Sequence, residues 1–270
     1  MSDAHGAPAV AGAPLLSLRG VSKRFGAVQA LHQVDFECDA GEVVALVGDN
    51  GAGKSTLVKA IAGTQPADEG TITFDGREVH IASPQAATEL GIATVYQDLA
   101  LCDNLDVVAN LFVGRELARG PGRNLRVLDE VAMEHQALGL MRRLAVSIPS
   151  VRTEVAALSG GQRQSVAVAR ATLGDPRVVL LDEPTAALGV AQTRQVLDLI
   201  RLLRDEGHGV IIISHNLVDV FEVADRIVVL RLGRRVASFQ VADTTAEEVV
   251  AAITGADQDQ VRSTYASEAS

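Results

Sequence analysis

Aromatic side chains and cysteine are scarce in this chain. Its 270 residues include no tryptophan, and aromatic residues make up only 3% of them. The core must therefore be aliphatic, which is typical of parallel strands that are buried on both faces. The only two cysteines, Cys38 and Cys102, lie far apart and form no C-x-x-C pair. The sequence therefore offers no disulfide or zinc framework, as expected for a chain in a reducing cytosol.

Basic residues and long apolar runs are also in short supply. Acidic residues outnumber lysine and arginine by 34 to 24, which gives a net charge of −10 and argues against a nucleic-acid partner. The best apolar runs, such as VVLL at 178–181 and VIII at 210–213, fall far short of the roughly 18 residues that cross a bilayer. We therefore expect no membrane span. The start of the chain also lacks the regions of a secretory signal.

Strand-like apolar runs alternate with helical segments from residue 15 onward. This pattern predicts an α/β domain with a mainly parallel sheet. Between about 97 and 160 the strand signals give way to helical ones, with a loop at 118–124, which predicts an inserted helical subdomain. The expected division is a flexible leader (1–14), a sheet core in two pieces (15–96 and 166–235), the helical subdomain (97–165), and a C-terminal helix with a loose tail (236–270).

Some element ends can be predicted locally. We expect a helix at 54–63 that stops at Gly63, and a hairpin that turns at Asp75-Gly76. Further strands are expected at 42–48, 91–96, 177–183, 209–214 and 226–233, with a helix at about 190–206 between two of them. Polar side chains end several of these strands.

A phosphate-binding motif follows the strand at 42–48. The stretch GDNGAGKST fits G-x-x-x-x-G-K-[ST] and lies between a strand and a helix, as the motif requires. Its glycines let successive backbone N–H groups face a phosphate at the positive end of the helix. Lys54 would reach the β- and γ-phosphates, and the Ser55 hydroxyl would bind Mg²⁺. The loop consists of Gly48, Asp49, Asn50, Gly51, Ala52, Gly53, Lys54, Ser55 and Thr56. The alternative is a glycine-rich turn without a ligand.

Polar side chains end three other predicted strands. Asp182 and Glu183 end VVLLDE, at the sheet edge where α/β domains bind ligands. Asp182 would hold the Mg²⁺ shell, and Glu183 would polarise the water that attacks the γ-phosphate. His215 would sense the γ-phosphate, and Gln97 could contact Mg²⁺ and the attacking water. Each of these residues alone could be an ordinary capping or solvent-facing side chain, but the phosphate loop favours the catalytic interpretation.

A second glycine-rich element, LSGGQ at 158–162, contains no lysine. Ser159 is a suitable N-cap for a helix that we expect to run to Leu173. A hydroxyl, glycine N–H groups and a helix dipole can bind a phosphate that another surface already holds. The residues concerned are Ser159, Gly160, Gly161 and Gln162. The alternative is a serine-capped helix whose glycines only provide clearance.

Taken in order, GDNGAGKST, VYQD, LSGGQ, VVLLDE and SH resemble the nucleotide-binding domains of ATP-binding cassette (ABC) proteins over residues 15–235. The resemblance implies a RecA-like P-loop NTPase core with a mainly parallel sheet, an antiparallel β subdomain and the inserted helical subdomain. It also implies ATP and Mg²⁺ as ligands, and a head-to-tail pair of cassettes in which each ATP lies between one P-loop and the other subunit's LSGGQ. Phe25 would stack on adenine where the family usually has tyrosine; a place in the core is the alternative.

Two stretches, VYQDLALCDNLDVVANLFVGRE and EPTAALGVAQT, look like the cassettes of bacterial sugar importers of the ribose, xylose and fructose class. Such cassettes are commonly tandem duplicates, whereas this chain has one set of motifs. It would therefore pair with a copy of itself or with a separate cassette. Gly189 stands where many cassettes have an aspartate, so communication between the two ATP sites could differ from the common pattern.

These features predict the ATP-hydrolysing subunit of a sugar importer, working as a homodimer at the cytoplasmic face of the membrane. Its partners would be an integral membrane permease, docked near Leu99–Leu111, and indirectly a periplasmic or extracellular sugar-binding protein. One alternative is a soluble cassette ATPase that remodels a ribosome or DNA; the other is an exporter cassette with the same chemistry. Only the sugar-type stretches separate the exporter from the importer.

Overall fold

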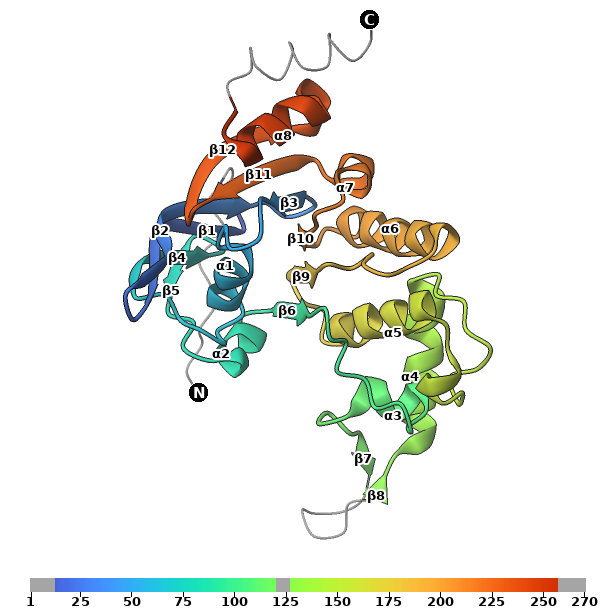
Figure 1. Ribbon diagram of the computed structural model, residues 1–270. Coiled ribbons are helices and arrows are strands. Elements are labelled where there is room, and N and C mark those ends of the chain that lie inside the picture. Colours follow the sequence, from blue (N-terminus) through green and yellow to red (C-terminus); the bar gives the residue numbers. More distant parts are fainter. Residues whose placement is uncertain (1–12, 120–126, 257–270) are drawn as a thin grey trace, which may run out of the picture.

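The computed structural model describes residues 13–119 and 127–256. The expected leader up to residue 12, part of the loop expected at 118–124 and the expected tail from residue 257 lie outside the described residues. Within these two ranges the chain forms two larger sheets, a two-stranded ribbon and eight α-helices (Figure 1).

Strands and helices alternate along most of the chain. The helices are α1 (Lys54–Ile61), α2 (Pro84–Glu89), α3 (Val107–Phe112), α4 (Glu130–Arg143), α5 (Gly160–Thr172), α6 (Val190–Asp205), α7 (Leu217–Val223) and α8 (Ala246–Thr254). The strands are β1 (Leu16–Phe25), β2 (Val28–Cys38), β3 (Val43–Val47), β4 (Glu69–Phe74), β5 (Arg77–Val79), β6 (Ile92–Val95), β7 (Ala118–Arg119), β8 (Val127–Leu128), β9 (Val178–Asp182), β10 (Gly209–Ile213), β11 (Arg226–Arg231) and β12 (Arg234–Gln240). None of the helices in the described ranges is long and apolar enough to cross a membrane.

The larger sheet has the strand order β12-β11-β3-β10-β9-β6. It is parallel except for the pair β11 and β12, which confirms the expected mainly parallel core. Its register aligns Ile213 of β10 with Asp182 of β9, and Val95 of β6 with Leu181 of β9. The carboxyl ends of β3, β10, β9 and β6 therefore lie along one edge, which is where open α/β sheets bind ligands.

The smaller sheet, β2-β1-β4-β5, is antiparallel and corresponds to the β subdomain implied by the resemblance. The hairpin between β4 and β5 turns at Asp75 and Gly76, as predicted, and both residues have a positive φ, 53° and 72°. Positive φ at both central positions gives the turn that matches the twist of the flanking strands.

Both faces of the larger sheet are buried under aliphatic side chains. Strand β3 is buried along its whole length. Its residues alternate between two hydrophobic clusters: Val43, Ala45 and Val47 pack with α5 and α6, whereas Val44 and Leu46 pack with α1 and the smaller sheet. This confirms the aliphatic core expected from the shortage of aromatic residues.

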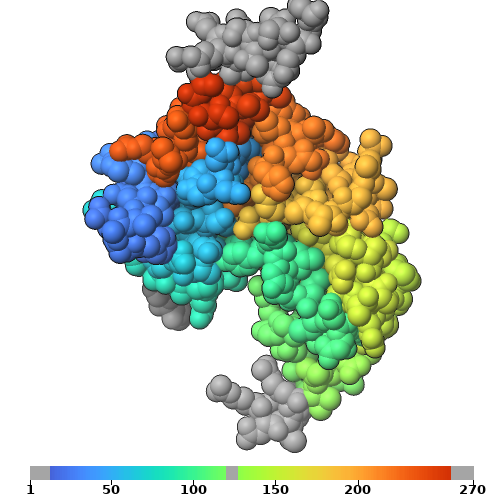
Figure 2. Space-filling view, in the orientation of Figure 1, coloured from blue at the N-terminus to red at the C-terminus, as the bar shows by residue number. Residues whose placement is uncertain are grey.

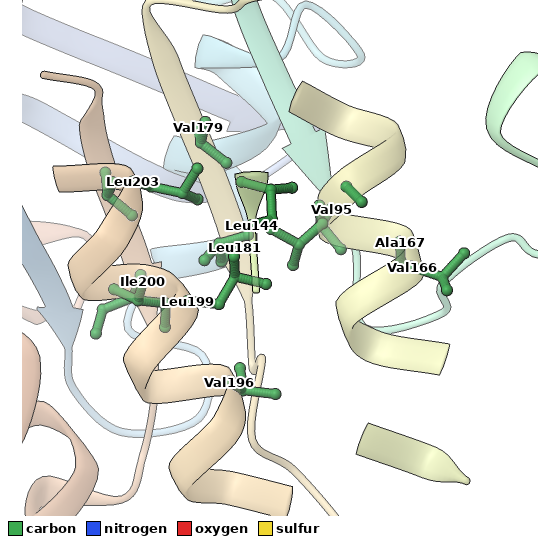
Figure 3. Packing of buried hydrophobic residues seen from close by; sticks show 14 of the residues in the cluster. Val95, Leu144, Val166, Ala167, Val179, Leu181, Val196, Leu199, Ile200 and Leu203 are labelled. Carbon is green, nitrogen blue, oxygen red and sulfur yellow. The ribbon is translucent and has the colours of Figure 1, made fainter. Parts of the chain in front are cut away.

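The helical subdomain shares its core with the sheet. Val166 of α5, Leu181 of β9 and Ile200 of α6 belong to one cluster, and Figure 3 shows α5 and α6 on either side of β9, with Leu181 between them. The same cluster includes Leu111 of α3 and Met141 of α4. Helix α5 runs without a break across residue 166, where the second piece of the sheet core was expected to begin. One continuous helix therefore belongs to both the subdomain and the sheet core.

Five of the described strands had no predicted range. Strands β1 and β2 lie where only alternating strand-like runs were expected. Strands β7 and β8 have two residues each and lie within the region expected to form the helical subdomain. Strand β12 pairs only with β11 at the edge of the larger sheet, and most of its residues are exposed or half-buried. A two-residue strand has no periodicity to detect, and an edge strand has little apolar alternation.

Buried Asn110 organises the loop that leads from β6 to α3. Asn110 is only 1% exposed, and its side-chain oxygen accepts a hydrogen bond from the backbone N–H of Cys102 at 2.7 Å. Its side-chain nitrogen donates to the carbonyls of Cys102, Leu105 and Asp106 at 3.0, 3.2 and 3.0 Å. One side chain therefore supplies hydrogen-bond partners that backbone groups of this loop would find in a helix or a sheet.

We predict that Asn110→Ala lowers the free energy of unfolding by about 1–3 kcal/mol, because backbone groups of the loop lose their partners. The matched control is Asn104→Ala, which removes an exposed asparagine from the same loop and should change the free energy by less than about 0.5 kcal/mol. Urea titration followed by circular dichroism measures both. Equal stability of the two variants would show that Asn110 does not hold the loop.

Candidate active site

The phosphate loop connects β3 to α1, between the strand and the helix predicted from the motif. Gly48, Gly51 and Gly53 have φ values of 144°, 81° and 105°, which side chains rarely adopt. A Cβ atom at Gly53 would lie 2.8 Å from the carbonyl oxygen of Ala30, and one at Gly48 would collide with that of Leu230. The loop can therefore take this curled path only because glycine occupies these positions.

Lys54, the first residue of α1, is 9% exposed and lies within the phosphate loop. Its amino group donates hydrogen bonds to the carbonyl oxygens of Gly48 and Asp49, at 2.5 and 3.0 Å. Burial lowers the pKa of Lys54, whereas the carboxylates of Glu183, Asp49 and Asp182 oppose this shift. The amino group is therefore held at the loop, under the influence of acidic groups from the loop itself and from the end of β9.

Glu183 and His215 meet at the edge of the larger sheet. The Oε2 atom of Glu183 lies 2.9 Å from Nδ1 of His215. The Glu183 side chain is 16% exposed, whereas that of His215 is 74% exposed. Glu183 has a φ of 51°, which is uncommon for a residue other than glycine, and its N–H donates to the carbonyl of Ile213 at 3.0 Å. The structure therefore brings together two of the predicted residues, with the acid shielded and the imidazole open.

Asp182 and Ser55 are the residues that could hold Mg²⁺. Burial raises the pKa of Asp182, the nearby Glu183 raises it further, and Lys59 and Lys54 oppose the rise. A divalent cation would relieve the repulsion between the two carboxylates. In residues 13–119 and 127–256, no group of three His, Cys, Asp or Glu side chains could hold a metal. Asp182 offers carboxylate oxygens and Ser55 a hydroxyl oxygen, and oxygen donors such as these fit Mg²⁺, which usually keeps water and phosphate oxygens as its other ligands.

Gln97 and Phe25 are both exposed. Gln97 lies two residues beyond the end of β6, and because Val95 pairs with Leu181, it is placed near the end of β9. Phe25 ends β1 and is 43% exposed, with Nζ of Lys23 5.6 Å from the centre of its ring. The alternative that placed Phe25 in the core is therefore wrong, and its ring is accessible for stacking.

The LSGGQ element begins α5, and Ser159 is its N-cap as predicted. The Ser159 hydroxyl accepts from the N–H of Gln162 at 3.3 Å, and Oε1 of Gln162 accepts from the N–H of Ser159 at 3.0 Å. Nε2 of Gln162 also donates to the carbonyl of Ser147 at 3.1 Å. A Cβ atom at Gly161 would lie 2.8 Å from Cβ of Gln192 on α6. Gly161 therefore does provide clearance, and the Gln162 amide has partners within the chain.

The phosphate loop and LSGGQ belong to helices on opposite faces of the larger sheet. Leu57 and Ile61 of α1 lie in one hydrophobic cluster, and Val166 and Val168 of α5 lie in the other. Figure 1 accordingly shows α1 and α5 on either side of β6 and β9. The two glycine-rich elements of one chain therefore begin helices that pack on opposite faces of its sheet.

A family model described as ABC transporter matches residues 31–186 of the chain. The chain belongs to the ABC transporter family. Its phosphate loop, Asp182 and Glu183 all fall within the matched residues.

Several relatives match this ABC cassette over most of its length. The fructose import ATP-binding protein FrcA of Rhizobium meliloti is 48% identical over 91% of this chain and 95% of its own. The xylose/arabinose import ATP-binding protein XylG of Sulfolobus acidocaldarius is 46% identical over 89% of this chain and 94% of its own. The ribose import ATP-binding protein RbsA 2 of Rhizobium etli is 43% identical over 92% of this chain but only 48% of its own.

Solved structures agree with the fold. The cbiO1 protein of Clostridium perfringens, part of the ABC transporter complex cbiONQ, matches with a TM-score of 0.73 and 26% identity, over 88% of this chain and 92% of that chain. A nucleotide-free ATP-binding cassette from an ABC transporter matches with a TM-score of 0.76 and 24% identity, over 93% and 99%. The predicted P-loop NTPase fold is confirmed.

Two contacts in the ABC cassette have no signal in the sequence. The Thr185 hydroxyl donates to Oδ2 of buried Asp219 at 2.6 Å. This bond ties the loop after Glu183 to α7, which follows His215. Arg170 of α5 contacts the loop after β6. Periodicity assigns each residue to an element, but it does not predict which elements meet.

We predict that Gly48→Ala weakens nucleotide binding far more than Gly51→Ala. Both residues have a positive φ, but only at Gly48 would the new methyl group collide with backbone; at Gly51, no atom of residues 13–119 and 127–256 lies within 4 Å of the added Cβ atom. Titration with a fluorescent ATP analogue should show a loss of at least about tenfold for Gly48→Ala and less for Gly51→Ala, tenfold corresponding to about 1.4 kcal/mol. Equal affinities would contradict the close packing of the loop on β11.

Proposed function

We propose that this cassette is the ATP-hydrolysing subunit of a sugar importer, acting as a homodimer at the cytoplasmic face of the membrane beneath a separate permease. The observation that carries the proposal is the 48% identity to the fructose import ATP-binding protein over nearly the whole of both chains. Relatives named for xylose/arabinose and ribose import support the same class of substrate. Among these three relatives, none is named for export or for remodelling of a ribosome or DNA.

ATP would bind first to the phosphate loop. The amino group of Lys54 would exchange its hydrogen bonds with the carbonyls of Gly48 and Asp49 for bonds to the β- and γ-phosphates. The backbone N–H groups at the start of α1 would face the same phosphates. The ring of Phe25 would stack on the adenine, supported by its exposure at the end of β1.

Glu183 is the general base of the proposed reaction. Its carboxylate would accept a hydrogen bond from the attacking water and polarise it toward the γ-phosphate. The contact with His215 would orient the carboxylate, and the exposed imidazole would also reach the γ-phosphate. Mg²⁺, held by Ser55 and Asp182, would neutralise charge that develops on the phosphate oxygens. Gln97 would contact the metal shell and the water from the neighbouring strand.

A second cassette completes each site in this proposal. The phosphate loop and LSGGQ of one chain belong to opposite faces of its sheet. A head-to-tail dimer would bring Ser159 and Gly160 of one subunit to the γ-phosphate held by the other. The helix dipole of α5 and its exposed N-cap support this role.

The permease would dock in a groove between the sheet core and the helical subdomain. The groove has a volume of about 330 Å³ and is lined largely by apolar residues, including Tyr96, Leu99 and Leu111. Figure 2 shows the surface hollowed between the cyan and green parts of the chain. Its lining includes residues of the expected docking region and the segment that follows Gln97. Movement of Gln97 with the γ-phosphate would therefore reach the permease, and through it the sugar-binding protein.

We predict that the Glu183→Gln variant forms a stable dimer with ATP, because the substrate binds but is not hydrolysed. Adding Ser159→Asp should abolish this dimer. Aspartate is as good an N-cap as serine, so α5 is preserved, but its charge repels the γ-phosphate of the partner's ATP. Size-exclusion chromatography with light scattering measures the dimer.

The same double variant should bind a fluorescent ATP analogue as a monomer with an affinity within about threefold of the Glu183→Gln monomer, since the phosphate loop is untouched. Ser159→Thr is the matched control and should keep the dimer. A Glu183→Gln variant that stays monomeric with ATP would contradict the sandwich, and loss of monomer binding in the double variant would contradict the role given to LSGGQ.

The import function is tested with the whole transporter. Purification of the tagged chain from membranes should recover a permease, and we predict that the complex in liposomes hydrolyses ATP at least about tenfold faster with sugar-loaded binding protein than without it. Fructose, xylose, arabinose and ribose are the sugars to screen. The chain with Lys54→Met, which cannot bind the phosphates, is the control. An ATPase rate that no sugar-loaded binding protein changes would contradict sugar import.

A further inference from the structure

The guanidinium group of Arg170 forms hydrogen bonds to the backbone just after Gln97. Nη2 donates to the carbonyl of Leu99 and Nη1 to that of Ala100, both at 2.7 Å. Ala100 has a φ of 49°, and its N–H donates to Oδ1 of Asp98 at 3.2 Å. The segment that leaves β6 is therefore a tight, strained turn whose two outward carbonyls converge on one arginine.

The Arg170 side chain is charged, but the groups that it binds are not. Burial lowers the pKa of Arg170, the nearby Cys102 opposes this shift, and the positive charge of Arg115 adds to it. Within the part of the chain that the structure describes, Arg170 forms no ion pair with a carboxylate. Both acceptors of its hydrogen bonds are neutral carbonyl groups. A half-buried charge without a counter-charge costs stability. The arrangement therefore favours a role in holding backbone geometry over a role in stabilising the fold.

Arg170 lies at the opposite end of α5 from the LSGGQ element. Helix α5 begins at the N-cap Ser159 and ends at Thr172, so one continuous helix carries LSGGQ at its start and Arg170 in its last turn. The segment held by Arg170 begins two residues after Gln97. Arg170 thus links the helix of one half-site to the loop of the other, and Arg163 of the same helix lies 4.0 Å from Asp103 further along that loop.

We propose that Arg170 is a positioning residue that couples the two ATP sites of the dimer. A γ-phosphate that draws in Gln97 would shift the turn at Leu99 and Ala100, and Arg170 would transmit the shift to α5. Ser159 at the other end of α5 would then close on the ATP held by the partner subunit. This inference rests on the proposed homodimeric ATPase.

The first test compares Arg170→Met with Arg201→Met in the otherwise unchanged full chain. Arg201 lies on α6 and donates to Asp198 and to Glu222, so its replacement removes a similar number of hydrogen bonds away from the site. Arg170→Met should lower kcat by about tenfold or more, as expected when catalytic groups lose their positions. It should also lower the Hill coefficient for ATP to about 1 from a wild-type value between 1 and 2.

A double-variant cycle separates positioning from a merely structural effect. Because Arg170 acts through the turn after Gln97, Arg170→Met should lower kcat by less than about twofold further in a Gln97→Ala background. Arg201→Met should have the same small effect in both backgrounds. Arg170→Lys, which can reach one carbonyl but not both as a planar fork does, should restore only part of kcat and of the Hill coefficient.

The outcomes distinguish this inference from the proposed function. If wild-type protein hydrolyses ATP cooperatively and Arg170→Met matches Arg201→Met, the coupling role is wrong while the ATPase stands. Full additivity with Gln97→Ala would likewise overturn it. A wild-type chain without ATPase activity would overturn the proposed function itself. Affinity of the Arg170→Met monomer for a fluorescent ATP analogue should remain within about twofold of wild type, and a larger loss would also count against the coupling role.

Discussion

The parallel hydrogen bonding of β3, β10, β9 and β6 is the constraint on which the site depends. It brings together the ends of four segments that are far apart in the sequence. Ile213 pairs with Leu46 on one side and with Asp182 on the other, so the phosphate loop, the acids and His215 follow strands that end at the same level. A slip of one residue would turn every side chain of a strand to the other face. The relative positions of these site residues therefore depend on the register of the sheet.

Different elements pack on the two faces of that sheet. One face carries α1 and the smaller sheet, and the other carries the helices of the subdomain and α6. Helix α5 packs on the sheet beside β6, and Arg170 near its end binds the loop that follows β6. The strained backbone of Glu183 is held on the same edge by its bond to Ile213 and by the link from Thr185 to Asp219.

The local chemistry of the chain could be predicted from its sequence, but its long-range contacts could not. The phosphate loop, the strand-end acids, the stop at Gly63 and the turn at Asp75-Gly76 are all encoded by neighbouring residues. By contrast, the roles of Arg170 and Asn110 depend on which backbone groups the fold leaves without partners. Strand β12 was missed because its pairing with β11, rather than its own pattern, makes it a strand. Gly161 had two plausible roles in the sequence, and only the distance to Gln192 shows that packing is one of them.

The hydrogen bonds of Lys54 keep the phosphate loop in one shape. Its amino group donates to the carbonyl oxygens of Gly48 and Asp49, so the charged end of the side chain has its partners within its own loop. In the proposed reaction, phosphate oxygens would replace these acceptors without a new arrangement of the loop. Little conformational entropy would then be lost when a nucleotide binds, and the larger movements of the proposed cycle would fall to the closing and reopening of the dimer.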